Sequence, residues 1–335
     1  KLPGVKVLCE TISNLHLEGN PYAIDSVIAG LSDEVKESLR PDIVICIGGA
    51  LISGMLKTFI RNCSPEIWTL GDSYFGIDTF KNLTLNIEVK PAFFFKALYF
   101  SLRKYYKKHS EYTTEIKKYV ESWNYIRNSQ LNLRDKFIDS IEWSELKAFR
   151  YIFNHIPRNC NLFLSNGTSV RYAQLFTTSI PHASYSNRGV SGIEGTSATA
   201  AGCAIPFKGS TILITGDMSF TYTPGVMGLE SIPRNFKIII INNKGGGIFR
   251  FISPTRYIEH RNRFFCADPA MPTKKIVEAY NWIYLKAESE QELAETLNKF
   301  LDCKNNAVLE IISDEEYSAS ILRKYMRLNA IDIKQ

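Results

Sequence analysis

The stretch TILITGDMSFTYTPGVMGLESIPRNFKIIIINNKGGGIFR, residues 211–250, decides the fold of this chain. It opens with an apolar, β-prone run at 211–215 that stops at a Gly-Asp pair, and a second apolar run at 236–241 stops at an Asn-Asn pair. Two continuous apolar runs joined by a crossover predict parallel strands that are buried on both faces of one sheet. Alternating helix and strand patterns on either side extend this unit into an α/β fold.

Polar residues follow both predicted strands. Gly216 and Asp217 come directly after the first strand, and Asn242 and Asn243 follow the second. Because parallel strands end side by side, we expect Asp217 and Asn243 to be neighbours. Their side-chain oxygens, with a backbone carbonyl such as that of Gly245, are hard ligands that suit Mg²⁺ and that Mn²⁺ also accepts. Small residues and a helix start beside them favour a diphosphate. Either pair alone is typical of an ordinary turn, but together they predict a metal-diphosphate site.

Three motifs, in this order along the chain, resemble one enzyme family. They are SNRGVSGIEGTSATAAGCA (186–204), GDMSF (216–220) and NNKGGGIFR (242–250). The GD and NN pairs, with 24 residues between them, resemble the diphosphate-binding signature of thiamine-diphosphate (ThDP) enzymes. The flanking residues are similar to the MenD family, the 2-succinyl-5-enolpyruvyl-6-hydroxy-3-cyclohexene-1-carboxylate synthases of menaquinone biosynthesis. The likeness is close over about 155–250 and extends elsewhere to the layout.

The resemblance implies ThDP and Mg²⁺ (or Mn²⁺) as cofactors. Asp217 and Asn243 would bind the metal through their side chains, and Gly245 through its carbonyl. Ile193 would support the folded cofactor. Ile248 and Phe249, in the third motif, would form the apolar wall over its thiazolium. The full set of implied cofactor-binding residues is Ser191, Gly192, Ile193, Gly216, Ser219, Phe220, Ile248 and Phe249.

Two arginines follow strand ends of the same predicted sheet, where ligands of open α/β sheets bind. The planar guanidinium groups of Arg171 and Arg188 suit carboxylates, although a surface ion pair would explain either one alone. The resemblance implies that both take substrate carboxylates. Where the family commonly has a serine, this chain has Gly167, so Thr168 or Ser169 is the expected polar substrate contact. A substrate-facing lysine of the family is replaced by Gly54.

The resemblance also implies a reaction and an assembly. Family members decarboxylate 2-oxoglutarate and add the remaining succinyl semialdehyde unit to isochorismate in a 1,4-addition. Their activating glutamate lies in an N-terminal pyrimidine-binding domain, which residues 1–335 do not contain. We therefore expect this chain to be the C-terminal part of a longer enzyme, to carry no catalytic residue of its own and to be inactive alone. Full-length chains are expected to form a dimer or tetramer.

We expect two domains with parallel sheets flanked by helices: a middle α/β domain at 1–105, a helical linker at 106–130 and a ThDP diphosphate-binding α/β domain at 131–335. In the first domain, strands are expected at 5–8, 43–47 and 66–70, and a helix at 53–61. In the second, strands are expected at 161–164, 182–186, 211–215, 236–241, 282–285 and 307–312, and helices at 143–153, 196–204, 273–280, 289–301 and 315–326.

Two alternative functions stay open. One is another ThDP enzyme, such as a 2-oxoacid decarboxylase or an acetolactate-type synthase, although those substrates carry fewer carboxylates for the arginine pair. The other is a non-catalytic nucleotide-binding module that uses Gly48 and Gly49, which follow a strand and precede a helix but lack the dinucleotide-binding spacing. The basic stretch at 103–118 with interleaved tyrosines could serve such a module, but a solvated helix face explains it better.

Composition limits the class of protein. The 335 residues are 45% hydrophobic and 22% charged, which is typical of a globular chain. The formal net charge of +6 is modest for this length and does not call for a nucleic-acid partner. The seven cysteines are scattered without a CxxC pair, which favours reduced thiols in a cytoplasmic protein. No apolar run is long enough to predict a membrane span.

Overall fold

The chain folds into two compact units. The computed structural model describes residues 4–15, 22–71, 77–109, 113–176, 182–267 and 271–331. Unit 1 is made of Lys1–Glu10, Ala23–Asp135 and Arg327–Gln335, and unit 2 of Thr11–Tyr22 and Lys136–Met326. Each unit contains a parallel sheet flanked by helices, which confirms the predicted fold class. Residues 106–130, expected from the sequence to form a linker, belong to compact unit 1. The division into domains at 1–105, 106–130 and 131–335 stays a prediction.

Unit 2 is built on a six-stranded sheet whose neighbouring strands are all parallel, in the order β5-β4-β6-β7-β9-β8. The strands are β4 (Cys160–Leu164), β5 (Ala183–Tyr185), β6 (Ser210–Gly216), β7 (Phe236–Asn242), β8 (Ile283–Ala287) and β9 (Ala307–Ile312). The two apolar runs that decide the fold are the central strands β6 and β7. Ile212, Leu213 and Ile214 are fully buried because helices cover both faces of the sheet.

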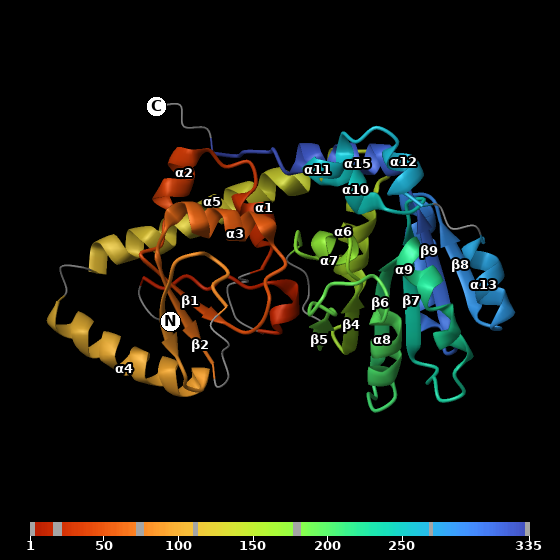
Figure 1. The fold of residues 1–335 in the computed structure, drawn as a ribbon, viewed down its shortest axis with the longest axis horizontal. Helices are drawn as coiled ribbons and strands as arrows, with labels where there is room; N and C mark the ends of the chain where they lie inside the picture. Colours follow the sequence, from red (N-terminus) through yellow and green to blue (C-terminus); the bar gives the residue numbers. More distant parts are fainter. Residues whose placement is uncertain are drawn as a thin grey trace. The chain divides into compact units, whose positions relative to one another are not determined.

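The helices of unit 2 follow the pattern of a crossover fold (Figure 1). They are α6 (Glu145–His155), α7 (Ser169–Ala173), α8 (Thr196–Ala204), α9 (Asp217–Tyr222), α10 (Gly247–Phe251), α11 (Ser253–Arg256), α12 (Arg261–Phe264), α13 (Thr273–Ala279), α14 (Glu290–Asp302) and α15 (Glu315–Tyr325), with 3₁₀ turns η1 (Thr11–Ser13) and η3 (Pro224–Gly228). One apolar core lies between the sheet and α8, α9 and α13, where small residues such as Ala200 and Ala204 permit close packing. The six strands and the helices α6, α8, α13, α14 and α15 therefore lie where the sequence predicted them, whereas α10, α11 and α12 were not predicted.

Strand register brings the polar ends of β6 and β7 to the same edge. Gly216 of β6 pairs with Ile241 of β7, and Asn242 of β7 pairs with Ile312 of β9. Asp217 and Asn243 are the first residues beyond these paired positions. The carboxyl edge of the sheet therefore collects the residues that the sequence analysis assigned to the metal and the diphosphate.

Unit 1 has a smaller sheet in the order β1-β2-β3, with strands β1 (Ile43–Ile47), β2 (Glu66–Leu70) and β3 (Leu83–Ile87). Its helices are α1 (Ile24–Ile28), α2 (Asp33–Ser38), α3 (Gly54–Cys63), α4 (Pro91–Lys108) and most of α5 (Thr113–Ser140). The basic stretch at 103–118 falls on α4 and α5, and residues 110–112 lie outside the described residues. No helix of the described residues is long and apolar enough to cross a bilayer.

One expected strand of unit 1 is wrong and another was missed. Residues 5–8 form no strand, and Val5 and Val7 remain 40% and 42% exposed, so their β-prone side chains join no buried sheet face. The third strand of the sheet is instead β3, where Thr84 and Asn86 interrupt the apolar pattern. Thr84 donates to and accepts from the backbone of Ile67, which helps hold β3 beside β2.

The turn after β1 resembles a nucleotide-binding turn, but a carboxylate of the chain itself already occupies the start of the following helix, α3. The buried Glu10 carboxylate accepts hydrogen bonds from the backbone N–H groups of Ile52 and Ser53, each at 2.8 Å, where α3 begins. Ser53 caps the helix by accepting from Leu56 and donates its hydroxyl to Asp25. A phosphate at this helix terminus would have to displace a built-in carboxylate. The nucleotide-binding alternative therefore loses its site at Gly48 and Gly49.

We predict that Glu10→Ala loosens the start of α3. The substitution leaves two buried N–H donors without an acceptor, which costs on the order of 3 kcal/mol. Hydrogen–deuterium exchange at Ile52 and Ser53 should become much faster. The exposed Glu121 on α5 provides the control, since Glu121→Ala should leave exchange at these amides unchanged. Equal protection in the two variants would contradict the role assigned to Glu10.

Candidate functional site

The site is organised by a carboxylate that joins two strand ends. Asp217 follows β6 at the first position of α9 and is 3% exposed. Its Oδ1 accepts from the backbone N–H of Met218 at 2.7 Å, and its Oδ2 accepts from the N–H of Gly245 at 2.7 Å. The second bond spans from β6 to the loop after β7. The strand ends thus lie side by side, as parallel pairing predicts.

Glycines make the close approach of that loop possible. Gly245 and Gly246 adopt left-handed backbone angles, with φ of 73° and 65°. A Cβ at Gly245 would overlap the carbonyl oxygen of Ala267, and one at Gly246 would lie 2.6 Å from that of Phe265. Side chains at either position would therefore collide with the backbone at 265–267 and displace the loop.

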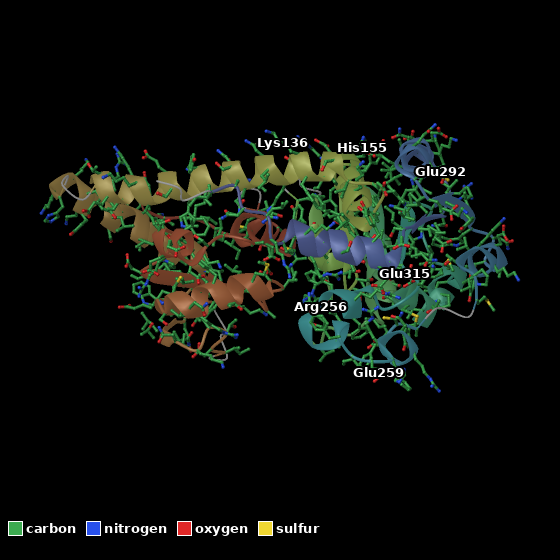
Figure 2. The ribbon with its side chains drawn as sticks, turned by 90° about the horizontal axis from the view of Figure 1, so that it is seen from above. Lys136, His155, Arg256, Glu259, Glu292 and Glu315 are labelled. Atoms are coloured by element: carbon green, nitrogen blue, oxygen red, sulfur yellow. The ribbon has the colours of Figure 1, made fainter. Side chains whose placement is uncertain are left out.

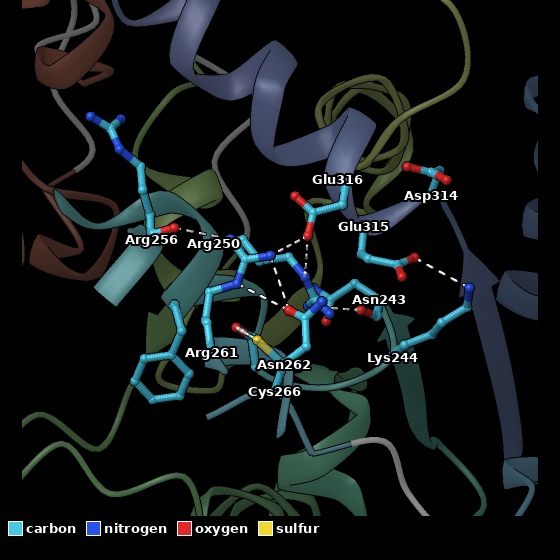
Figure 3. Close-up of polar contacts among 12 residues, drawn as sticks. Asn243, Lys244, Arg250, Arg256, Arg261, Asn262, Cys266, Asp314, Glu315 and Glu316 are labelled. Atoms are coloured by element: carbon cyan, nitrogen blue, oxygen red, sulfur yellow. Dashed lines mark hydrogen bonds and ion pairs between the residues drawn. The ribbon is translucent and has the colours of Figure 1, made fainter. Parts of the chain in front are cut away.

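A buried arginine holds the same loop from behind (Figure 3). Arg250, on α10, is 3% exposed, and its Nη1 donates to the carbonyl of Gly245 at 2.7 Å and to that of Asn243 at 3.3 Å. Its Nε lies 3.3 Å from Oε1 of Glu316 on α15, and Arg261 contacts the same carboxylate oxygen. The Glu316 charge compensates the buried guanidinium. We call Arg250, Arg261 and Glu316 the arginine clamp.

The neighbouring ion pair lies farther out on the surface. Lys244 Nζ is 3.4 Å from Oε2 of Glu315, and the lysine side chain is 58% exposed. Figure 2 shows Glu315 at the start of α15, with Arg256 and Glu259 on the segment that runs from α11 to α12. The pair contributes little to stability because one partner is solvated.

A buried glutamate lies behind Asn243. Glu145, the first residue of α6, is 4% exposed, and its Oε1 accepts from Nδ2 of Asn243 at 3.0 Å. Its Oε2 has no hydrogen-bond partner among the described residues. Burial raises the pKa of the Glu145 carboxyl to about 7; the Asn243 hydrogen bond and the Arg250 charge oppose the rise, and the Asp217 carboxylate adds to it. Burial and the nearby Glu145 also raise the pKa of Tyr172 well above its ordinary value.

The loop at 186–195 is held by two polar side chains. Asn166, just after β4, donates through Nδ2 to the carbonyls of Asn187 at 2.8 Å and Gly192 at 2.7 Å. Ser219, on α9, donates its hydroxyl to the carbonyl of Ile193. Ser191, between them, has a positive φ of 59°. Gly192 is therefore tied to the end of β4, and Ile193 to the helix that begins at Asp217.

The two arginines of the substrate hypothesis bind adjacent residues of one turn. Arg188 Nη1 donates to Oδ1 of Asn166 at 2.6 Å, and Arg171 Nη1 donates to the carbonyl of Gly167. Thr168 precedes α7 but makes no side-chain capping bond to it. Nε of Arg188 is buried without a hydrogen-bond partner among the described residues. One strand end thus holds both guanidinium groups.

The other expected cofactor residues differ in exposure. Phe220 is 1% exposed and packs in the core beside α8, whereas Ile248 and Phe249 are half-buried. The Phe249 ring centroid lies 5.4 Å from that of Phe265. No heavy atom lies within 4 Å of a Cβ built on Gly216, so the backbone there is open.

The donor set fits a hard cation. It consists of a carboxylate, a carboxamide oxygen and a backbone carbonyl, all oxygen, from Asp217, Asn243 and Gly245. Over the described ranges, no group of three or more His, Cys, Asp or Glu could hold a metal ion. The expected set needs no such group, because diphosphate oxygens and water fill the other positions of an octahedral site. All seven cysteines, each in the described part of the chain, are free thiols.

Sequence reasoning missed Glu145, Asn166, Arg250 and Glu316. Asn166 could have been found, since it follows a predicted strand at the same sheet edge as Asp217. Arg250 ends the third motif, but only its contacts show that it supports the loop. Glu145 and Glu316 stand at the starts of helices where acidic residues are common, so no local pattern distinguishes them.

The chain is similar in sequence to known thiamine pyrophosphate enzymes. Residues 166–311 match the C-terminal TPP (thiamine pyrophosphate) binding domain of thiamine pyrophosphate enzymes. A 2-succinyl-5-enolpyruvyl-6-hydroxy-3-cyclohexene-1-carboxylate synthase of Porphyromonas gingivalis is 36% identical over 332 residues, which cover 97% of this chain and 56% of that protein. The synthase of Flavobacterium psychrophilum is 34% identical over 323 residues, which cover 96% of this chain and 57% of that protein. The chain is a MenD-like sequence.

The matched domain contains every residue that the sequence analysis assigned to cofactor, metal or substrate. Glu145 and Glu316 lie outside it, at either end. The MenD-like chain spans little more than half the length of these curated relatives. The residues that support Asn243 and Arg250 thus come from parts of the chain that the domain match does not include.

We predict that Glu316→Gln loosens the loop after β7. Removing the counter-charge of Arg250 should cost about 1 kcal/mol, since Glu316 itself is half exposed, and this corresponds to roughly fivefold faster hydrogen exchange at Gly245. Glu315→Gln is the matched control, because its neighbour Lys244 is solvated and exchange should stay within about a factor of two. The same exchange rates in both variants would rule out the arginine clamp as a support of the loop.

We also predict a pH effect at Glu145 in the metal-free protein. Because its pKa is raised from 4.5 to about 7, the stability that the neutral carboxyl contributes is complete below pH 4.5 and is lost as the pH rises through 7. Glu145→Gln keeps the acceptor for Asn243 and removes the titration. The variant's advantage in free energy of unfolding should grow over this interval to on the order of 3 kcal/mol.

Calorimetric unfolding from pH 4.5 to 8 measures this difference. The exposed Glu142, three residues earlier, supplies the control variant Glu142→Gln. A stability difference between wild type and Glu145→Gln that does not change with pH would disprove the assignment of a raised pKa.

Proposed function

We propose that this chain forms the middle and cofactor-binding parts of a ThDP- and metal-dependent synthase of menaquinone biosynthesis. The proposed reaction decarboxylates 2-oxoglutarate and adds the succinyl semialdehyde unit to isochorismate. The hydrogen bond from the Gly245 N–H to the Asp217 carboxylate supports the proposal, because it holds the loop that contains Asn243 and Gly245 beside Asp217 at one sheet edge. The names of the related synthases support the choice of reaction.

In this proposal Asp217, Asn243 and Gly245 would hold Mg²⁺ or Mn²⁺, and Ser219 and the backbone at 191–193 would contact the cofactor. When bound, ThDP supplies the electronic work of decarboxylation and carbon–carbon bond formation, while the protein orients the reactants. The half-buried Ile248 and Phe249 exclude water from the reacting end.

Carboxylate recognition distinguishes this reaction from those of other ThDP enzymes. Both proposed substrates carry more than one carboxylate, and Arg171 and Arg188 provide two planar guanidinium groups on one strand end. Their bonds to Gly167 and Asn166 hold both guanidinium groups beside the end of β4. Thr168, between the two supporting residues and α7, is the proposed polar contact.

We predict that ThDP binding requires both the metal and Asp217. Calorimetric titration should show ThDP binding with Mg²⁺ present, and Asp217→Ala should weaken it by at least about 100-fold because a charged ligand is lost. Asp302→Ala, at an exposed position on α14, is the control and should bind like the wild type. Metal-independent binding, or unchanged binding by Asp217→Ala, would refute this assignment.

Mass spectrometry of the whole gene product with Mg²⁺, ThDP, 2-oxoglutarate and isochorismate tests the reaction. The decarboxylated 1,4-adduct is the expected product, and Arg171→Ala or Arg188→Ala should reduce its formation. Decarboxylation without an adduct would assign the chain to another ThDP enzyme that acts on 2-oxoacids. Absence of both reactions would refute the proposed function.

A further inference from the structure

The carboxamide of Asn243 has two chemically different ends. Its Oδ1 can bind a cation, whereas its Nδ2 carries two hydrogens and can only donate. A half-turn of the side chain would exchange these ends and present hydrogens to a metal. A metal ligand of this kind therefore needs a neighbour that selects one orientation.

Glu145 contacts the nitrogen end. Its Oε1 accepts from Nδ2 of Asn243 at 3.0 Å, and both residues are only 4% exposed, so water does not compete for the bond. The Oε1 that accepts from Nδ2 carries no hydrogen to offer Oδ1, so this contact is made only in the observed orientation of the carboxamide. This pairing leaves Oδ1 for a cation.

Glu145 is itself held in place by helix α6. Its backbone N–H donates to Oγ of Ser318 on α15 at 3.1 Å, and Ser144 before it caps the helix by accepting from the N–H of Lys147 at 3.4 Å. The Glu145 side chain therefore starts from a backbone position tied to two helices.

The loop side is equally restricted. A Cβ on Gly247 would collide with Nδ2 of Asn243, so the carboxamide packs directly against the backbone there. Arg250 holds the Asn243 carbonyl at 3.3 Å. With the backbone held and one face covered, the hydrogen bond to Glu145 decides which end of the carboxamide points away from α6.

We propose that Glu145 is a positioning residue that fixes the Asn243 carboxamide with Nδ2 toward α6 and so presets Oδ1 as a metal ligand. The inference rests on the proposed function for the identity of the bound group. Glu145 acts through Asn243 and touches neither cofactor nor substrate. Partners that orient metal ligands in this way contribute strongly to affinity, because the ligand is already in its binding orientation.

The test measures Mn²⁺ affinity by electron paramagnetic resonance in the presence of ThDP. Glu145→Leu keeps the volume and removes the acceptor, and should weaken Mn²⁺ binding about 10- to 100-fold. Glu145→Gln restores an acceptor oxygen and should recover binding to within about threefold of wild type. Glu142→Leu, the same substitution at an exposed position, is the matched control.

A double-mutant cycle separates positioning from other roles. In an Asn243→Ala background there is no carboxamide to orient, so Glu145→Leu should weaken Mn²⁺ binding no further. A further loss in that background would mean that Glu145 acts on the metal independently of Asn243. That result, or wild-type affinity in Glu145→Leu, would overturn the proposal.

A metal-free measurement keeps this inference distinct from the proposed function. The side-chain NH₂ signals of Asn243, assigned by their loss in Asn243→Ala, should exchange slowly with solvent in the wild type and in Glu145→Gln. They should exchange rapidly in Glu145→Leu. If the wild type binds no Mn²⁺ with ThDP, the proposed function fails, while slow exchange lost in Glu145→Leu still upholds the positioning by Glu145. Rapid exchange in the wild type would refute that positioning.

Discussion

The hydrogen bond between the Gly245 N–H and the Asp217 carboxylate is the constraint on which the site depends. It requires parallel pairing of β6 and β7 in the observed register, since a shift of one residue would separate the two strand ends. It also requires glycine at the loop position nearest Ala267. The buried strands and the glycine-rich loop thus serve one purpose, which is to bring two polar strand ends together.

Around this bond, buried charges are arranged in compensating pairs. Asp217 accepts two backbone N–H groups, and Arg250 donates to the carbonyls of the same loop. Glu316 balances Arg250 from α15, whereas Glu145 is balanced only in part, which is why burial raises its pKa to about 7. A divalent cation beside these groups would favour the ionised form of Glu145. The chain therefore supplies more acidic groups near the loop than its own basic groups neutralise.

The two units share one local geometry, a parallel strand followed by a turn and a helix start. In each, a parallel strand leads through glycines to a helix start, a place that favours anions. In unit 1 the helix α3 receives the carboxylate of Glu10 and a serine bonded to Asp25, so its terminus is satisfied from within. In unit 2 the Met218 N–H at the start of α9 likewise donates to the Asp217 carboxylate, while no heavy atom lies within 4 Å of a Cβ built on Gly216. The geometry of the turn alone therefore does not distinguish a ligand site from a structural contact.

The sequence by itself determined the elements that repeat a simple pattern. Continuous apolar runs predicted β6 and β7, and helical periodicity predicted α13, α14 and α15, because burial of a strand or helix face leaves a local trace. Even so, β3 was missed where polar residues interrupt the run, and residues 5–8 were wrongly expected to form a strand. The positions of Asp217 and Asn243 followed from strand pairing alone. Only the tertiary structure placed Glu145 behind Asn243, Asn166 under the 187–192 loop and Glu316 against Arg250. These contacts join side chains from elements far apart in the chain, and no local periodicity encodes which helix start will pack against which loop.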